Sequence, residues 1–189
     1  MIISLIGYRG TGKTTIGQLL AHELSIPFID ADMLLQERAG RTIKEIFATN
    51  GEATFRQLES SLILELTGSR EPAILSTGGG VVLNPFNRQA LRNAGPVVWL
   101  RASPHVICQR LSQDPATAAQ RPALLTNTTP TGASQGSPGE AMLREVETLL
   151  KIREPLYLET ATFQVETDHR NERDIVREIV ASLEQGSPR

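Results

Sequence analysis

This sequence has a single cysteine, no excess of positive charge and no long apolar run. Its single cysteine, Cys108, excludes a disulfide within the chain and a zinc site built from several cysteines. The 19 Lys and Arg residues are outnumbered by 21 Asp and Glu residues, unlike the strongly basic domains that bind nucleic acids. No apolar run approaches the roughly 18 residues of a membrane-spanning helix, and the N-terminus lacks the basic region of a signal peptide. We therefore expect a cytoplasmic protein that binds neither nucleic acid nor a membrane.

The 189 residues suit one domain, which we expect to span 1–185 and to leave a short tail at 186–189. Short apolar runs alternate with longer amphipathic ones, a pattern typical of a parallel sheet covered by helices on both faces. The predicted strands are 2–6, 27–30, 72–76, 96–100 and 163–166. The predicted helices are 13–24, 85–94, 104–111 and 173–183, with two or three more in 31–67 that break at Gly40 and near Gly51.

One segment has a different composition. Eleven of the fifteen residues from Thr126 to Glu140 are Ser, Thr, Gly or Pro, so this stretch has too few apolar side chains to order itself. It could be a linker between domains or a mobile surface loop. Because only about fifty residues follow it, we favour the loop, which in an enzyme can act as a lid over the site.

Residues 7–14, Gly-Tyr-Arg-Gly-Thr-Gly-Lys-Thr, match the P-loop pattern G-x-x-x-x-G-K-[ST]. The glycines let backbone N–H groups turn toward phosphate oxygens, and the helix that follows offers its positive N-terminal end to the anion. Lys13 would reach the β- and γ-phosphates, and the Thr14 hydroxyl would bind Mg²⁺. A merely glycine-rich turn is the alternative, but the motif lies between a predicted strand and a predicted helix. The pattern therefore predicts a site for a nucleoside triphosphate.

Two further polar features follow predicted strands, at the edge where parallel sheets bind ligands. Strand alternation would direct the carboxylates of Asp30 and Asp32 to one side, where one could hold metal-bound water and the other accept a hydroxyl proton. Either could instead cap the next helix. The Gly78–Gly80 run would let a ligand approach the backbone, or simply form an open turn. Arg56 and Arg153 are candidates for a bidentate grip on a carboxylate, although each alone could be a surface residue.

Taken together, these residues resemble those of the shikimate kinases, and the similarity covers nearly the whole chain. A P-loop alone is shared with motors, GTPases and many small-molecule kinases, whereas the combination of motifs is specific. In family order, the matching segments are GYRGTGKT, FIDAD, GRTIKEIFATNGEATFRQLE, ILSTGGG, RPAL and IREPLY.

The resemblance implies a phosphotransferase that moves the γ-phosphoryl group of ATP to the 3-hydroxyl of shikimate, giving shikimate 3-phosphate and ADP on the route to chorismate and the aromatic amino acids. It implies a three-layer α-β-α fold with a five-stranded parallel sheet of order 2-3-1-4-5. It also implies a substrate-binding region at about 31–62, a mobile lid at about 112–140, a monomeric state, and ATP with one Mg²⁺ ion per subunit.

The resemblance also implies a role for each matching residue. The catalytic residues would be Lys13, Asp32 and Arg121, with Asp32 as the candidate base. The nucleotide would contact Gly10, Thr11, Gly12, Lys13, Thr14, Thr15, Arg110, Arg121 and Arg170. Shikimate would contact Asp32, Arg56, Gly78, Gly79, Gly80 and Arg153, in a pocket that Phe47, Phe55 and Glu59 help to shape. Thr14 and, through water, Asp30 would hold the metal ion.

The chain departs from the family pattern between Arg121 and Arg153, where it is longer than expected, and the surplus falls in the 126–140 tract. Loop-closure entropy grows only with the logarithm of length, so this insertion need not destabilise the fold. Two other functions fit the P-loop: a kinase for another polyol acid such as gluconate, and a nucleotide-binding regulator without activity. The first would not require the pair of arginines around the glycine run. The second should have lost Lys13, Asp32 or Arg121, and all three are present.

Overall fold

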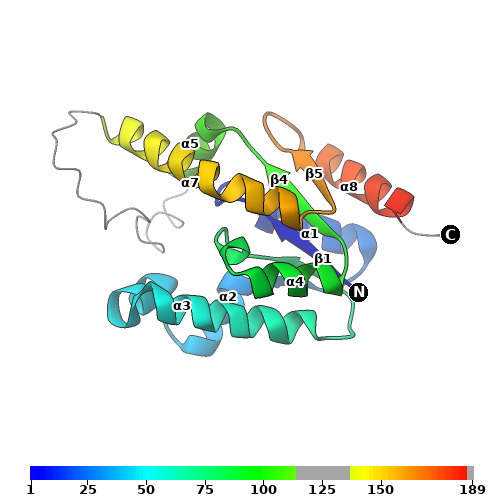
Figure 1. Ribbon diagram of the computed structural model, residues 1–189. Helices are drawn as coiled ribbons and strands as arrows, with labels where there is room; N and C mark the ends of the chain where they lie inside the picture. The colour runs from blue at the N-terminus through cyan, green and yellow to red at the C-terminus, as the bar shows by residue number, and fades with distance from the viewer. Residues whose placement is uncertain (114–136, 187–189) are drawn as a thin grey trace.

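The computed structural model of the protein describes residues 1–113 and 137–186 (Figure 1). Five parallel strands form one sheet in the order β2-β3-β1-β4-β5, which confirms the topology that the resemblance implied. The strands are β1 (Ile2–Ile6), β2 (Phe28–Asp30), β3 (Ala73–Ser76), β4 (Val97–Arg101) and β5 (Phe163–Glu166). Each corresponds to a predicted strand whose ends differ by no more than one residue.

Helices cover both faces of the sheet, so the expected three-layer α-β-α architecture is confirmed (Figure 1). One face is covered by α1 (Lys13–Leu24) and α8 (Glu172–Gly186). The other is covered by α3 (Ile43–Thr67), α4 (Pro85–Ala94) and α7 (Pro138–Thr160). The remaining elements are α2 (Ala31–Ala39), which packs on α3, α5 (Pro104–Gln113), which packs on α7, and the 3-10 turn η1 (Val81–Leu83).

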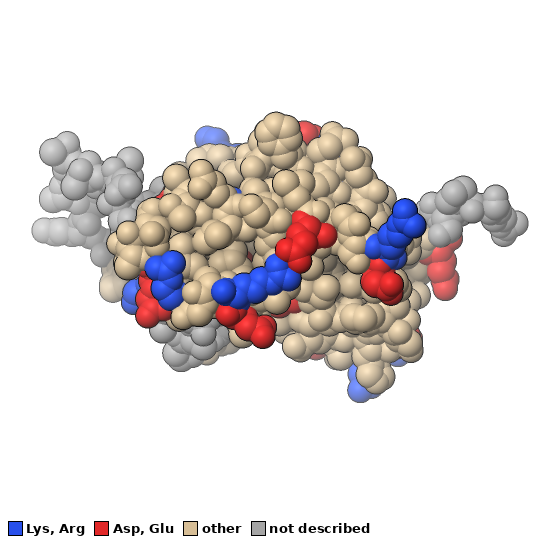
Figure 2. Space-filling model, turned by 90° about the horizontal axis from the view of Figure 1, so that it is seen from below, with Lys and Arg blue, Asp and Glu red and all other residues tan. Residues whose placement is uncertain are grey.

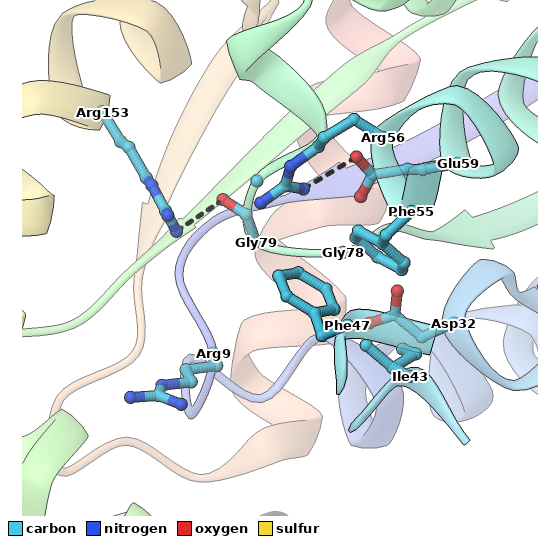
Figure 3. A pocket seen from close by; sticks show the side chains of 11 residues that line it. Arg9, Asp32, Ile43, Phe47, Phe55, Arg56, Glu59, Gly78, Gly79 and Arg153 are labelled. Carbon is cyan, nitrogen blue, oxygen red and sulfur yellow. Dashed lines mark hydrogen bonds and ion pairs between the residues drawn. The ribbon is translucent and has the colours of Figure 1, made fainter. Parts of the chain in front are cut away.

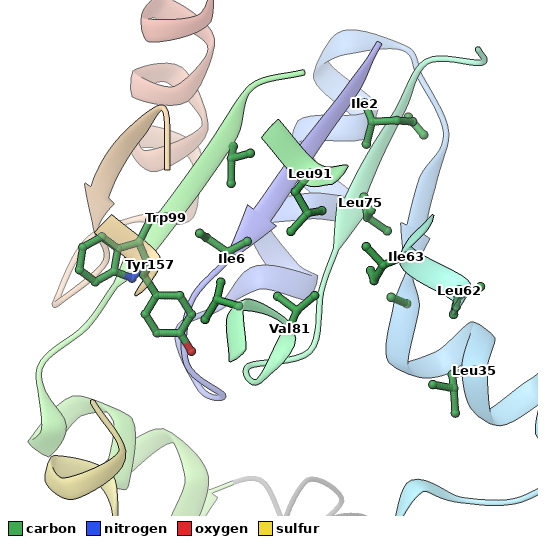
Figure 4. Packing of buried hydrophobic residues seen from close by; sticks show 14 of the residues in the cluster. Ile2, Ile6, Leu35, Leu62, Ile63, Leu75, Val81, Leu91, Trp99 and Tyr157 are labelled. Carbon is green, nitrogen blue, oxygen red and sulfur yellow. The ribbon is translucent and has the colours of Figure 1, made fainter. Parts of the chain in front are cut away.

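Burial of the sheet on both faces explains why its three central strands, β1, β3 and β4, are mostly apolar. All five residues of β1 are buried. Ile6 packs with Leu75 and Tyr157 on the face that carries α3, α4 and α7 (Figure 4). Its neighbour Leu5 packs on the opposite face with Leu20 of α1. Successive residues of one strand therefore enter different cores, and no polar alternation is possible along it.

The structure places helix α7 where the sequence predicted none. The helix begins at Pro138, inside the tract that was expected to be a loop up to Glu140. Ser137 and Glu140 form a capping box, in which each side chain accepts a hydrogen bond from the backbone N–H of the other residue. Pro138 fits the first turn because an N–H at that position has no partner within the helix. The Ser, Thr, Gly and Pro content of the tract hid this helix start.

The expected lid at about 112–140 therefore overlaps described helices at both ends. Ser112 and Gln113 belong to α5, and residues from Pro138 onward belong to α7. The rest of the expected lid, 114–136, including Arg121, lies outside the described residues. The predicted breaks at Gly40 and near Gly51 are confirmed. Gly40 ends α2 in a left-handed conformation, and Gly51 interrupts the helical dihedral angles of α3 at φ 78° and ψ 170°.

The face formed by α2 and α3 carries acidic and basic side chains close to one another (Figure 2). Arg38 of α2 donates two hydrogen bonds to Glu65 of α3, at 2.6 and 2.8 Å, and so ties the two helices together. Both side chains are about half exposed, so this pair contributes little to stability. In the part of the chain that the structure describes, every helix is too short or too polar to span a bilayer.

Gly95 lies between α4 and β4, where the backbone passes close to the start of β1. Its φ of 150° is one that side-chain-bearing residues rarely adopt, and a Cβ atom there would overlap the carbonyl oxygen of Ile2. The obstacle is backbone, which cannot move aside as a side chain can. The close passage of the chain from α4 into β4 over the start of β1 therefore requires glycine at this position.

We predict that Gly95→Ala lowers the free energy of unfolding by about 2 kcal/mol or more. The cost of the strained backbone conformation adds to that of the overlap between the new Cβ atom and the Ile2 carbonyl oxygen. The matched control is Gly139→Ala, in the first turn of α7, where a Cβ would meet nothing closer than 4.0 Å. That variant should be as stable as the parent or gain up to about 1 kcal/mol from helix propensity. Urea unfolding of the three proteins measures the difference, and a Gly95→Ala variant with parental stability would contradict the prediction.

Candidate active site

Three loops that follow β1, β2 and β3 meet at one edge of the sheet. They are the P-loop between β1 and α1, the start of α2 after Asp30, and the glycine run Gly78–Gly80 after β3. Because the strands are parallel, their carboxyl ends lie at the same edge, which is where such sheets bind ligands. Two adjoining cavities open there, and Arg9, Asp32 and Ile43 line both of them.

The P-loop is held in shape by hydrogen bonds to its own carbonyl groups. The Lys13 ammonium group donates to the carbonyl oxygens of Gly7 and Tyr8, at 2.9 Å each. The Thr11 hydroxyl also donates to the Tyr8 carbonyl, at 2.8 Å. Gly12 precedes α1 in a left-handed conformation, and no side chain caps the helix. The first N–H groups of α1 are thus left for an anion, as a phosphate site requires.

The larger cavity contains most of the residues predicted to bind nucleotide. Gly10, Gly12, Lys13, Thr14, Thr15 and Arg110 all line it. Arg110 is fixed there by hydrogen bonds to the carbonyl oxygens of Gly10, at 3.1 Å, and Thr167, at 2.7 Å. Thr11 is buried and its hydroxyl is used within the loop. Arg170 is not among the lining residues and pairs instead with Glu178 of α8, at 2.6 Å, so its predicted role gains no support from this cavity.

Asp30 performs the capping role and also contacts the P-loop. One carboxylate oxygen accepts hydrogen bonds from the backbone N–H groups of Asp32 and Met33, and so caps α2. The other accepts from the Thr14 hydroxyl, at 2.9 Å. A hydroxyl and a carboxylate oxygen fit Mg²⁺, which is usually held by one or two side chains, water and substrate phosphates. No cluster of three or more Asp, Glu, His or Cys residues that could hold a metal occurs within 1–113 and 137–186.

The strand-alternation argument for Asp32 was wrong. Strand β2 ends at Asp30 and α2 begins at Ala31, so Asp32 lies in the first turn of a helix. Its carboxylate nevertheless reaches the same region as Asp30, because both residues line the larger cavity. Asp32 is only 8% exposed and is the one acidic residue that lines both cavities within the described residues.

The second cavity is smaller than the first and lies beside the glycine run. Its empty volume, which includes space open to solvent, is about 460 Å³, against about 1370 Å³ for the first. Ile43, Phe47 and Phe55 form an apolar wall, and the rings of the two phenylalanines pack at a centroid distance of 4.9 Å. The other lining residues are Arg9, Asp32, Arg56, Glu59, Gly78, Gly79, Gly80 and Arg153 (Figure 3).

Arg56 is held in this cavity by two carboxylates of its own helix. It donates to Glu59 at 2.8 Å and to Glu52 at 3.1 and 3.2 Å. Glu59 is 4% exposed, and its second carboxylate oxygen has no hydrogen-bond partner among the described residues. Burial raises the pKa of Glu59 above its usual value, and the neighbouring charge of Arg56 opposes this only in part.

The glycine run makes room for these ionisable side chains. A Cβ atom on Gly78 would lie 2.8 Å from carboxylate oxygens of both Asp32 and Glu59, and one on Gly80 would overlap the Arg56 guanidinium. The Gly79 carbonyl accepts hydrogen bonds from Arg153, at 3.3 Å, and from Tyr157. Figure 3 shows Arg56 of α3 and Arg153 of α7 reaching this turn from different helices. The two arginines that were predicted to bind a carboxylate therefore line the same cavity.

Sequence reasoning missed some residues that the structure places at this site. Arg9 and Ile43 line the second cavity, and Tyr157 binds the Gly79 carbonyl. The variable positions of the P-loop motif gave no signal for Arg9. Tyr157 lies in the segment IREPLY, which carried the resemblance, but only its arginine was assigned a role.

Comparison with known proteins agrees with this geometry. A model of the shikimate kinase family matches residues 9–184. The chain belongs to the shikimate kinase family. The shikimate kinase of Syntrophus aciditrophicus is 42% identical over 178 residues, which cover 94% of this chain and 88% of that protein. That of Enterococcus faecalis is 38% identical over 183 residues, 97% of this chain and 98% of the relative.

A solved structure gives the same result for the fold. The shikimate kinase from Acinetobacter baumannii, in complex with shikimate, superposes with a TM-score of 0.82 at 34% identity, covering 100% of this chain and 95% of that one. The similarity extends over the whole sheet and its helices. Membership of the family makes the chain an ATP-dependent kinase.

We predict that Glu59→Gln changes how stability depends on pH. Because the native pKa of Glu59 is raised above 4.5, the native state binds this proton more tightly than the unfolded chain does. The contribution of Glu59 to the free energy of unfolding is therefore greatest below pH 4.5 and decreases as the pH rises through its native pKa. The variant lacks this decrease, so its stability relative to the parent should rise as the pH increases from 4.5 through the native pKa of Glu59.

Urea unfolding at several pH values measures this difference. The control is Glu52→Gln, which removes the other carboxylate partner of Arg56 at a position where the side chain is 56% exposed. A Glu59→Gln variant whose relative stability is constant or falls with pH would refute the prediction.

Proposed function

We propose that this chain transfers the γ-phosphoryl group of ATP to the 3-hydroxyl of shikimate, giving shikimate 3-phosphate and ADP. The observation that carries the proposal is the position of Asp32, which borders both the P-loop cavity and the cavity that contains Arg56 and Arg153. A substrate whose carboxylate is bound by the arginines can place a hydroxyl beside Asp32, next to the phosphates. Phosphoryl transfer depends mainly on such positioning and on neutralising charge.

The carboxylate of shikimate would be bound by Arg56 and Arg153. Guanidinium groups match a carboxylate in shape and can donate two parallel hydrogen bonds. Arg56 already has the carboxylates of Glu52 and Glu59 as partners, which fix its direction before a substrate arrives. The apolar wall of Ile43, Phe47 and Phe55 suits the carbon ring between the polar ends of the substrate.

The transferred group would be handled from the P-loop side. Lys13 would exchange its carbonyl partners for phosphate oxygens, and backbone N–H groups at the start of α1 would bind the same anion. Asp32 would align the acceptor hydroxyl and take up its proton. Arg121 is assigned to the transferring phosphate by the resemblance alone, since it lies outside the described residues.

Thr14 and Asp30 are the residues that would hold Mg²⁺, Thr14 through its hydroxyl and Asp30 through water. When bound, the ion would neutralise negative charge on the phosphates. Their existing contact of 2.9 Å supports the pairing. The resemblance further predicts a monomer that acts in the cytoplasm, and sedimentation of the purified protein would then give one species with the mass of a single chain.

The direct test is ADP release by the purified protein with Mg-ATP and shikimate, gluconate or no acceptor. We expect release only with shikimate to exceed the blank, and we expect a chelator to abolish it and added Mg²⁺ to restore it. Activity with gluconate alone would support the other polyol acid kinase. ATP binding without release for any acceptor would support the regulator and contradict the proposal.

Asp32→Asn serves as the matched variant in this assay, because it keeps the shape of the side chain and removes its charge. Loss of a positioned base costs about 10²–10⁴-fold in rate. A loose transition state puts little charge on the nucleophile, so we expect a loss near 10²-fold in kcat with the KM for ATP unchanged. Unchanged turnover would contradict the role assigned to Asp32.

A further inference from the structure

Tyr8 is a P-loop residue whose side chain is buried away from the P-loop cavity. It is 1% exposed, and it is not among the residues that line either cavity. Its ring packs into an apolar cluster with residues of α5 and α7, among them Ile107, Leu111 and Val146. The second position of the P-loop motif is free to vary, so phosphate binding does not explain a buried tyrosine here.

The ring of Tyr8 lies against the guanidinium group of Arg153. The distance from the Arg153 guanidinium carbon to the ring centroid is 5.6 Å, within the range of a cation–π interaction. Arg153 is 5% exposed, and its hydrogen bond to the Gly79 carbonyl is long, at 3.3 Å. Among the described ion pairs, Arg56 has two carboxylate partners and Arg153 has none.

This difference between the two arginines matters for substrate recognition. A carboxylate partner fixes a guanidinium but competes with a substrate carboxylate for it. An aromatic face also fixes the guanidinium, yet leaves its edge donors and its charge available. Burial raises the pKa of Tyr8, so the ring stays neutral at physiological pH and does not act as a rival anion.

Tyr8 is itself fixed by hydrogen bonds to its backbone carbonyl and by an ion pair of the next residue. Its carbonyl oxygen accepts hydrogen bonds from Lys13, at 2.9 Å, and from the Thr11 hydroxyl, at 2.8 Å. The next residue, Arg9, forms an ion pair of 3.1 Å with Glu145 of α7, the helix that carries Arg153. The backbone of the P-loop and α7 are therefore fixed relative to one another at this point.

We propose that Tyr8 is a positioning residue of the substrate site: its ring orients Arg153 for the substrate carboxylate, so the nucleotide-binding loop takes part in recognising the acceptor. This inference rests on the proposed function. Tyr8 lines neither cavity, so its effect is exerted through Arg153. Its contribution should therefore depend on the negative charge of the acceptor carboxylate.

The test is Tyr8→Leu, with Tyr8→Phe as the matched control that keeps the ring and removes the hydroxyl. We expect Tyr8→Leu to lower kcat/KM for shikimate by about 3- to 30-fold, mainly through KM, with the KM for ATP unchanged. Tyr8→Phe should stay within about twofold of the parent, because its ring offers the same face to the cation. Tyr8→Met, which also lacks an aromatic face, is the second variant if Tyr8→Leu does not fold.

The methyl ester of shikimate separates positioning from a general structural defect. The ester has no carboxylate charge, so the ratio of kcat/KM between parent and Tyr8→Leu should fall close to one with this acceptor. An equal loss with shikimate and with the ester, or no loss with shikimate, would overturn the inference. A parent protein that fails to phosphorylate shikimate would instead contradict the proposed function, which makes the two failures distinguishable.

Discussion

The absence of side chains on Gly78, Gly79 and Gly80 is the constraint on which the site depends. Side chains from three helices converge on this turn, and there is no room for a further carbon atom between them. Asp32 and Glu59 flank Gly78, and the Arg56 guanidinium lies directly over Gly80. The turn therefore works as a surface against which ionisable groups are packed and oriented.

The parallel sheet brings this turn to the phosphate-binding loop. β3 lies beside β1, so the glycine run that follows β3 is next to the P-loop that follows β1. Contact between the two loops is direct, because the backbone of Gly79 faces that of Arg9. The two cavities are therefore neighbours because of the strand order, and Asp32 borders both without any movement of the chain.

Much of this arrangement could be predicted from the sequence. The central strands β1, β3 and β4 were recognisable because burial on both faces makes them mostly apolar, and the P-loop because its chemistry restricts residue types at fixed spacing. The start of helix α7 was missed because its capping box lies in a segment of loop-like composition, although most of the helix follows that segment. The roles of Tyr8 and Tyr157 were missed for another reason: both act through contacts with residues more than seventy positions away, to which no local pattern points.

Binding of shikimate to Gly80→Ala, measured by calorimetry with ADP as the control ligand, tests the central claim most directly. The atoms nearest to the added methyl group are all at the flexible end of the Arg56 side chain, so the fold should tolerate it while the guanidinium is displaced. A charge-assisted hydrogen bond is worth about 1.5–3 kcal/mol, so we expect shikimate affinity to fall about 10- to 100-fold with ADP affinity unchanged. Parental affinity for shikimate would contradict the account of the glycine turn and of the arginine that it accommodates.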